Sequence, residues 1–340
     1  MTVVERGTGL RPGGQAVDVR GVALDVVERM GLLAEARAVR TRMRGMSVLD
    51  ADGKEVHRST EVAYSSGRLD SDDIEILRED LVRLIHERTR DDVEYLFGDT
   101  VTALDEGAAG VRVQFAGEAP RTYDLVIGAD GLHSTVRRLA FGPEERFAHH
   151  LGSYLSVFGT DNFLGLEDWQ VWLRDGEAGF GIMPVRGNTE LRVAFGIESG
   201  PLERDAGALR RIITERLASI RWEGPRLAEA ALGAPDFYCD AMAQIRMDSW
   251  SLGRVALLGD AGYCPSPLSG QGTSLALVGA HVLADCLART PEDHASAFAC
   301  YEGRMRPFVA LNQALATENP GGPASEASVE LAKNALSLDG

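Results

Sequence analysis

The chain has 340 residues, of which 44% are hydrophobic and 25% are charged, a balance typical of a globular protein of one or two domains. Its formal net charge of −16 argues against nucleic acid and anionic membrane surfaces as partners, because like charges repel. Glu5 and Arg6 interrupt the start before an apolar run develops, so no signal peptide is predicted and a cytoplasmic protein is expected. The four cysteines form no CxxC pair, which favours reduced thiols over a zinc site or a disulfide framework.

The first quarter of the chain predicts strand, helix, hairpin and helix in that order. Residues 2–6 indicate a buried strand that ends in an acid, and residues 22–30 repeat apolar side chains at helical spacing. Residues 43–70 predict a polar hairpin around an Asp-Gly turn. A second amphipathic helix is expected to begin at a capping box formed by Asp72 and Glu75. Its predicted apolar stripe comprises Ile74, Leu77, Leu81, Leu84 and Ile85.

The middle of the chain is dominated by strand patterns. Residues 93–115 alternate between strands and glycine turns, and residues 125–127 form a short run typical of a buried strand. The pattern is again strand-like from 153 to 197. Turns within that segment are predicted at Gly176, Gly179 and Gly187-Asn188. A helix near 208–217 precedes further strand-like sequence up to residue 247.

A last buried strand is predicted at residues 254–258, and the remainder of the chain is expected to be helical. Buried strands alternate with helices at both ends of the chain, which implies an α/β fold with a mostly parallel sheet. The strand-rich middle is then an insertion with its own sheet, and both termini belong to one domain. The first domain comprises residues 1–42, 71–150 and 250–340, and the second, substrate-binding domain comprises residues 43–70 and 151–249.

The most informative segment is residues 259–272, which follow a buried strand and open a helix. It reads Gly-Asp-Ala-Gly-Tyr-Cys-Pro-Ser-Pro-Leu-Ser-Gly-Gln-Gly. The acid at the strand end, Asp260, suits a hydroxyl of a ribityl or ribose chain. Gly270 and Gly272 at a helix N-terminus let backbone N–H groups approach an anionic or electron-rich ring edge, and the helix dipole adds to the attraction.

This segment resembles the GD motif of the group A flavin monooxygenases, the family of 4-hydroxybenzoate hydroxylase and the tetracycline-inactivating monooxygenases. The resemblance implies that Asp260 contacts the ribityl–pyrophosphate part of FAD and that Pro267 packs beside the isoalloxazine ring. The implied contacts to the pyrimidine edge of that ring come from Gly270, Gln271 and Gly272. Ser274 departs from the family, where asparagine is common, so that side-chain contact is not transferred. A turn-rich loop before an ordinary helix is the alternative.

A second motif, residues 128–137, also follows a buried strand and precedes a helix. It reads Gly-Ala-Asp-Gly-Leu-His-Ser-Thr-Val-Arg and resembles the DG motif of the same family. In that family the Asp-Gly pair, here Asp130 and Gly131, organises the pyrophosphate region and the approach of the nicotinamide. A common Asp-Gly turn is the alternative, and the order of the two motifs along the chain favours the family.

The remaining candidates lie near the N-terminal strand. Glu5, at the tip of that strand, is expected to accept hydrogen bonds from the adenosine ribose, with Arg6 beside it. Arg78 matches the family's helix arginine that lies against the flavin or its pyrophosphate, and Arg20 is a candidate for the flavin rim. A solvated helix arginine is the alternative for Arg78.

The dinucleotide fingerprint, a G-x-G-x-x-G loop about 20 residues before the acid, is missing from the sequence. Because the acid is Glu5, the resemblance implies a Rossmann-like FAD-binding fold that lacks its first strand and helix and carries an inserted, mostly antiparallel β-sheet substrate domain. Without that central strand its neighbours keep unpaired backbone groups, so the chain is expected to be marginally stable and to bind FAD weakly.

The resemblance implies an FAD-dependent monooxygenase that uses NAD(P)H and molecular oxygen to hydroxylate an aromatic or polycyclic small molecule. A flavin dehydrogenase or reductase on the same fold and a truncated remnant that holds no FAD are the alternatives. No side chain is singled out as an essential acid or base, no metal site is predicted, and the oligomeric state is left open. The candidates for the substrate cavity's wall, which are more often plain core, are Trp169, Trp172, Phe180, Met183 and Pro184.

Overall fold

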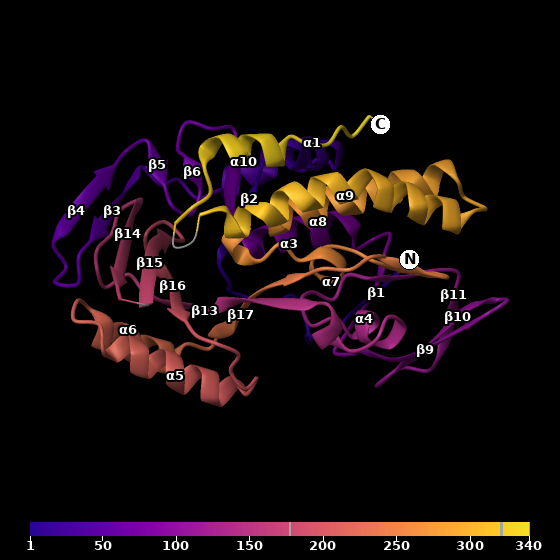
Figure 1. Cartoon of the computed structure of the whole chain (residues 1–340), viewed down its shortest axis with the longest axis horizontal. Helices are drawn as coiled ribbons and strands as arrows, with labels where there is room; N and C mark the ends of the chain where they lie inside the picture. Colours follow the sequence, from indigo (N-terminus) through magenta and orange to yellow (C-terminus); the bar gives the residue numbers. More distant parts are fainter. Residues whose placement is uncertain (177, 320–321, 340) are drawn as a thin grey trace.

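The computed structural model describes residues 1–176, 178–319 and 322–339. A large β-sheet with two helices on one face occupies one end of the molecule (Figure 1). In the rest of the molecule, several helices lie over smaller sheets. Both termini lie away from the large sheet (Figure 1).

Seven strands form the large sheet. They are β3 (Gly45–Leu49), β4 (Glu55–Ser59), β13 (Ala148–Asp161), β14 (Trp169–Asp175), β15 (Ala178–Val185), β16 (Glu190–Glu198) and β17 (Tyr238–Ile245). Their order is β17-β13-β16-β15-β14-β3-β4, and β14 with β3 is the parallel pair in an otherwise antiparallel arrangement. The predicted inserted, mostly antiparallel sheet is confirmed, whereas the exact domain boundaries remain a prediction.

One turn prediction in this sheet is wrong. Gly179 lies inside β15, opposite Gly196 of β16, and not in a turn. A Cβ on Gly179 would come 2.9 Å from the carbonyl oxygen of Leu173 on the neighbouring strand. The glycine therefore serves a close approach between strands, which a turn signal in the sequence does not distinguish.

Helices α5 (Ala206–Ala218) and α6 (Gly224–Gly233) pack on one face of the large sheet. The second of them was not predicted, because the region after residue 217 was interpreted as strand. Pro225 is the second residue of α6, and Leu227, Ala228 and Ala231 bury one side of the helix. These side chains join Phe180 of β15 in the core beneath the sheet. Phe180 is therefore core and not cavity wall.

The parallel strands form two separate small sheets. Strand β1 (Thr2–Glu5) pairs with β8 (Glu94–Phe97), while β12 (Val126–Gly128) pairs with β19 (Val255–Leu257), which also pairs with β18 (Ser251–Leu252). Val4 of β1 and Val126 of β12 pack on one apolar cluster, yet no described strand joins β1 to β12. The predicted parallel α/β arrangement is confirmed, but its parallel strands form two separate small sheets instead of one.

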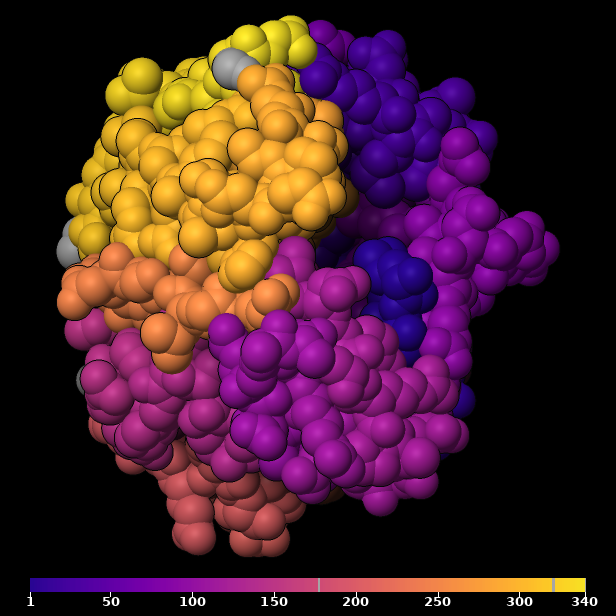
Figure 2. All heavy atoms as spheres, turned by 90° about the vertical axis from the view of Figure 1, so that its right-hand side faces the viewer, coloured from indigo at the N-terminus to yellow at the C-terminus, as the bar shows by residue number. Residues whose placement is uncertain are grey.

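A hollow lies beside the N-terminal strand. Figure 2 shows it between the indigo N-terminal residues and the yellow-orange C-terminal helices. Ile127, in the middle of β12, is 36% exposed. The expectation of a buried strand at 125–127 is therefore wrong, because β12 lacks a neighbour along one edge.

The second predicted helix begins six residues later than its expected capping box. Residues 74–77 form strand β7, which pairs antiparallel with β2 (Ala16–Val19), and helix α3 (Arg78–Thr89) follows. Glu75 is therefore a strand residue opposite Asp18 and caps no helix. Pairing with a strand 58 positions earlier decides this outcome, since a short apolar run suits either element locally.

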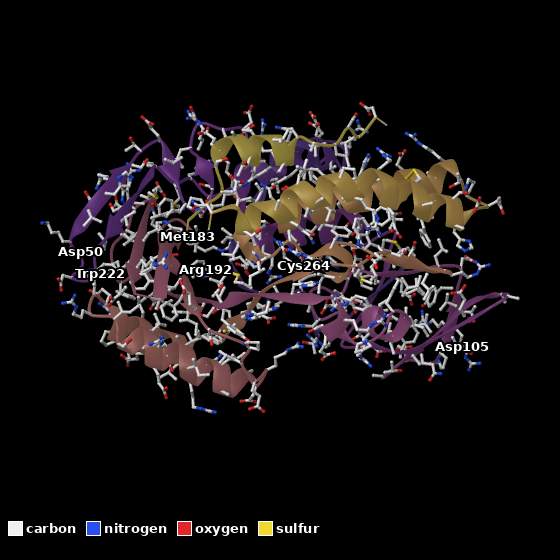
Figure 3. The ribbon with its side chains drawn as sticks, in the orientation of Figure 1. Asp50, Asp105, Met183, Arg192, Trp222 and Cys264 are labelled. Atoms are coloured by element: carbon white, nitrogen blue, oxygen red, sulfur yellow. A yellow bond between two sulfur atoms is a disulfide. The ribbon has the colours of Figure 1, made fainter. Side chains whose placement is uncertain are left out.

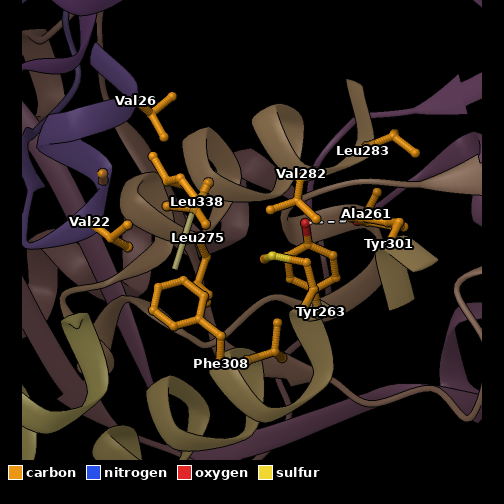
Figure 4. Close-up of a cluster of buried hydrophobic side chains, with 14 of the residues drawn as sticks. Val22, Val26, Ala261, Tyr263, Leu275, Val282, Leu283, Tyr301, Phe308 and Leu338 are labelled. Carbon is orange, nitrogen blue, oxygen red and sulfur yellow. Dashed lines mark hydrogen bonds between the residues drawn. The ribbon is translucent and has the colours of Figure 1, made fainter. Parts of the chain in front are cut away.

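The helical layer contains α1 (Val22–Arg29), α2 (Leu33–Val39), α8 (Gly272–Arg289), α9 (His294–Glu318) and α10 (Glu326–Lys333). Its core is packed around Tyr263 and Tyr301, whose hydroxyl groups are 2.9 Å apart (Figure 4). Cys286 of α8 and Cys300 of α9 form a disulfide, which corrects the expectation of four reduced thiols. The antiparallel packing of two consecutive helices brings these cysteines together, a proximity that their spacing does not reveal.

The other elements are short. They are β5 (Val62–Ala63), β6 (Gly67–Arg68), β9 (Val101–Gly107), β10 (Gly110–Phe115), β11 (Arg121–Tyr123), α4 (Thr135–Ala140), α7 (Asp260–Tyr263) and two 3-10 turns, η1 (Glu144–Arg146) and η2 (Pro267–Ser269). Among the helices that the structure describes, none has the length and apolarity needed to span a membrane.

Candidate functional site

The two glycine-acid motifs lie side by side. Because β12 and β19 are parallel neighbours, residues 128–131 and 258–260 leave the sheet at the same edge, and the Leu258 N–H donates to the Gly128 carbonyl at 2.8 Å. Arg137 is fully buried and donates to the carbonyl oxygen of Ala261 at 2.9 Å. One arginine of the motif around Asp130 therefore fixes the loop of the motif around Asp260.

Asp130 acts first on its own helix. Its carboxylate accepts from the Ser134 hydroxyl and from the backbone N–H groups of Thr135 and Val136, at 2.7 and 3.0 Å. These contacts satisfy donors at the start of α4. Gly131 follows with φ of +81°, a conformation that favours glycine. Asp130 therefore shapes the loop, and direct contact of its carboxylate with a cofactor remains a prediction.

The N-terminus of α8 has unused hydrogen-bonding capacity. Its N-cap residue, Gln271, makes no side-chain cap, is 0% exposed, and leaves both amide atoms without a partner. Gly270 before it has φ of +64°, and Pro267 opens the exposed turn η2 ahead of both. A buried amide and an uncapped helix N-terminus fit an electron-rich ligand edge.

Asp260 stands beside this helix start. Its Oδ1 lies 3.9 Å from the position that a Cβ on Gly272 would take. Burial raises the pKa of Asp260, and a side-chain hydrogen bond with Cys264 opposes that rise. A carboxylate in such surroundings gains stability from a hydroxyl donor, as a ribityl chain supplies.

Arg20, which directly follows strand β2, reaches the same loop. Its backbone N–H donates to the Ser274 hydroxyl at 3.0 Å, and its Nη2 lies 3.9 Å from the position of a Cβ on Gly270. The guanidinium also donates to Asp18 at 2.8 Å. The structure thus brings Arg20 together with the Gly270–Gly272 segment.

Arg78, Glu5 and Arg6 belong to a different part of the site. Arg78 is the first residue of α3 and donates to the carbonyl oxygens of Arg11 and Gly13, at 3.2 and 2.9 Å. Burial lowers the pKa of Arg78. Glu5 is exposed and accepts from the Gly7 N–H at 2.6 Å, and Arg6 is exposed. Arg78 therefore shapes the loop after β1, and a contact of these three with FAD remains a prediction.

Two features of the site escaped the sequence analysis. Arg192 of β16 is 7% exposed, donates to the Gly14 carbonyl at 3.3 Å, and neighbours Met183 of β15 in register (Figure 3). Asp18 and Glu75 form a buried carboxyl pair. An acid between Val17 and Val19 in a strand is the signal that could have revealed this pair.

The residues present fit FAD. Gln271 supplies an unpaired amide, α8 an uncapped N-terminus, Asp260 an acceptor for a hydroxyl, and Gly270 and Gly272 open backbone. These features meet at the carboxyl ends of parallel strands, where open α/β sheets bind nucleotide cofactors. Among the described residues, no group of three His, Cys, Asp or Glu side chains could hold a metal ion.

The fold and this loop arrangement define a flavoprotein with a mixed α/β fold and a large sheet, and the comparisons agree. A family model described as "FAD binding domain" matches residues 1–311. A flavin-dependent monooxygenase of Legionella longbeachae is 37% identical over 317 residues, which cover 92% of this chain and 80% of the relative. The uncharacterized protein Rv1260 of Mycobacterium tuberculosis is 50% identical over 326 residues, 95% of this chain and 88% of that protein.

Comparison with solved structures also indicates a flavoprotein fold. The tetracycline destructase Tet(55) superposes with a TM-score of 0.87 at 34% identity, covering 99% of this chain and 91% of that one. CtdE in complex with FAD, at 17% identity and a TM-score of 0.76, shares the fold. The chain belongs to the FAD-binding-domain family and is an FAD-dependent monooxygenase.

Proposed function

We propose that the protein uses NAD(P)H and molecular oxygen to hydroxylate an aromatic or polycyclic small molecule. The observation that carries the proposal is a cavity of about 440 Å³ lined by Asp18, Met43 and Glu75. Arg20 joins this cavity to the Gly270 loop, so a ligand there would sit next to the flavin site. The similarity to tetracycline destructases, which are named for a polycyclic substrate, supports the same substrate class.

When bound, FAD supplies the oxygen-activating chemistry, and the protein's own residues bind and orient the reactants. Gln271 and the N-terminus of α8 would bind the electron-rich edge of the ring, and Asp260 would accept a hydrogen bond from a hydroxyl of its side chain. Met43 and Leu69 are the apolar side chains of the cavity lining, and Met43 packs against Met183 of the large sheet. A cytoplasmic location completes the proposal, since NAD(P)H is a cytoplasmic reductant.

Oxygen stoichiometry tests this function. The FAD-loaded protein is given NADPH and a polycyclic phenol in an oxygen electrode, and products are weighed by mass spectrometry. A monooxygenase consumes one oxygen molecule for each NADPH and adds one oxygen atom to the phenol. Equal NADPH consumption with hydrogen peroxide as the product would identify a flavin reductase instead.

A further inference from the structure

Asp18 and Glu75 face each other across strands β2 and β7. They are direct partners in the antiparallel register, which places their Cβ atoms about 4.5–5.5 Å apart on one face. The Asp18 side chain is 11% exposed and Glu75 is 7% exposed. Arg20 bonds to Asp18 at 2.8 Å, and its positive charge also acts on Glu75. Such a pair favours the retention of one proton between its members.

Several buried atoms around this pair have no partner. They are Glu75 Oε1, Ser66 Oγ and Arg20 Nε. The other oxygen of Glu75 accepts from the Thr41 hydroxyl at 3.0 Å. Glu75 and Ser66 both line the cavity of about 440 Å³. A polar group of a ligand in this cavity would satisfy atoms that otherwise carry a desolvation cost.

The cavity touches both parts of the molecule. Met43 lines it and packs against Met183 of the large sheet. A hydrogen-bond chain also crosses from that sheet, in which the Trp172 indole donates to Gln170 at 3.0 Å and Gln170 donates to Ser65 at 2.5 Å. Ser65 in turn accepts from Arg20 through its carbonyl oxygen, at 3.0 Å. The carboxyl pair therefore lies where a substrate would bridge the large sheet and the flavin loop.

The wider surroundings of the pair are balanced in charge. Besides Asp18 and Glu75 themselves, the charged groups that line the cavity are Arg40, Arg42, Arg68, Asp70, Asp72 and Asp73. Asp73, at the entry to β7, is held by Lys333 of α10 at 2.9 Å. Because the surrounding charges offset one another, the site favours a neutral ligand that both donates and accepts hydrogen bonds.

We propose that Asp18 and Glu75 together bind a neutral phenolic hydroxyl group of the substrate and exchange their shared proton with it. The protonated carboxyl group donates to the phenolic oxygen, and the carboxylate accepts the phenolic O–H. Transfer of that proton to the carboxylate leaves a phenolate held by two carboxyl O–H groups, so charge and protons balance. A phenolate ring is richer in electrons and so a better acceptor of an electrophilic oxygen. This inference rests on the proposed function for its substrate class.

Binding of 2,3-dihydroxynaphthalene, followed by its fluorescence, tests the pair without turnover. The full chain is titrated with this probe from about pH 5 to about pH 8, with and without added FAD. We expect the wild-type affinity to be constant at low pH and to fall about tenfold per pH unit above about 7, because the pair then loses its shared proton.

The amide variants give the sharpest readout. Asp18→Asn and Glu75→Gln each mimic the protonated partner permanently, so each keeps the low-pH affinity within about threefold and loses the pH dependence. The double variant has no carboxylate left to accept the phenolic O–H and binds about tenfold more weakly at every pH. Asp25→Asn, an acid-to-amide change on the exposed side of α1, keeps the wild-type profile.

Three outcomes would overturn the proposal: no saturable binding by the wild type, an unchanged pH break in either single variant, or wild-type affinity in the double variant. A purely structural role for the pair would lower the affinity without removing the break. Probe binding with the expected profile in a protein that fails to oxygenate any phenol would contradict the proposed function alone.

Discussion

Asp260 is half-buried at the end of β19, and the rise in its pKa reflects a charge that the protein alone does not fully stabilise. We therefore expect Asp260→Ala to weaken FAD binding, by loss of a charge-assisted hydrogen bond worth about 1.5–3 kcal/mol, or roughly ten- to a hundredfold. Titration of the apoprotein with FAD measures the change in FAD affinity. Asp124→Asn, at the opposite end of the neighbouring strand, is the control and keeps the wild-type affinity. Unchanged affinity in Asp260→Ala would contradict the motif assignment.

Asp18 gives the protein a distinctive pH dependence of stability. Burial raises its pKa to about 7 in the folded state, against 3.8 when unfolded. Between these values the folded chain binds the proton and the unfolded chain does not, so stability falls as pH rises from about 4 to about 7. The loss is on the order of 2–4 kcal/mol and is complete above about pH 7.

Urea unfolding at several pH values checks this dependence. Asp18→Asn removes the titrating group, so its free energy of unfolding changes less between about pH 4 and 7 than that of the wild type. Glu75 shares the proton, so Glu75→Gln should flatten the curve in the same way. Parallel curves for the wild type and both variants would show that the pair is fully ionised throughout.

At the scale of elements, motifs were easier to predict than pairings. The strand–loop–helix segments around Asp130 and Asp260 carry their signal within about 15 residues, and both were located from the sequence. Strand β7 was mistaken for the start of a helix because its partner, β2, is distant in the chain. The pair formed by Asp18 and Glu75 could not be predicted for the same reason, because the register between distant strands determines which side chains are neighbours.

The disulfide between α8 and α9 is an element-scale constraint with a measurable effect. It closes a loop with a sequence separation of 14, and a loop of that size contributes about 3 kcal/mol in the chain-entropy model. We expect dithiothreitol to lower the melting temperature of the wild type by several degrees. Cys300→Ser should melt at the reduced wild type's temperature and be insensitive to the reductant. Equal melting of oxidised and reduced wild type would contradict the constraint.

At the scale of the whole molecule, we expect the break between the two parallel sheets to lower stability. Strands β1 and β12 lie in separate sheets, no described strand pairs with the second edge of either, and Ile127 of β12 is 36% exposed. Each buried unpaired backbone group costs about 1–3 kcal/mol. The expectation of a marginally stable chain with weak FAD binding stays a prediction.

A fusion tests that prediction. A strand–GxGxxG–helix unit of about 30 residues joined ahead of residue 1 should raise the melting temperature and the amount of FAD that copurifies. A control unit with valine in place of its three glycines should restore the strand pairing but not the phosphate-binding loop. We expect this control to raise the melting temperature but to leave the amount of copurified FAD low. If residues 1–340 alone hold stoichiometric FAD and melt like the fusion, the gap is of no energetic consequence.

The parallel pairing of β3 with β14 also determines how early during synthesis the large sheet can form. Leu49 and Trp169 belong to paired strands but leave the ribosome 120 residues apart, which takes roughly 6–24 s at about 5–20 residues per second. The hydrogen bond between Arg20 and Ser274 can form only later still, because these residues are 254 positions apart in the chain. We therefore expect nascent chains to complete the large sheet first, and the flavin pocket to be assembled only after α8 has emerged.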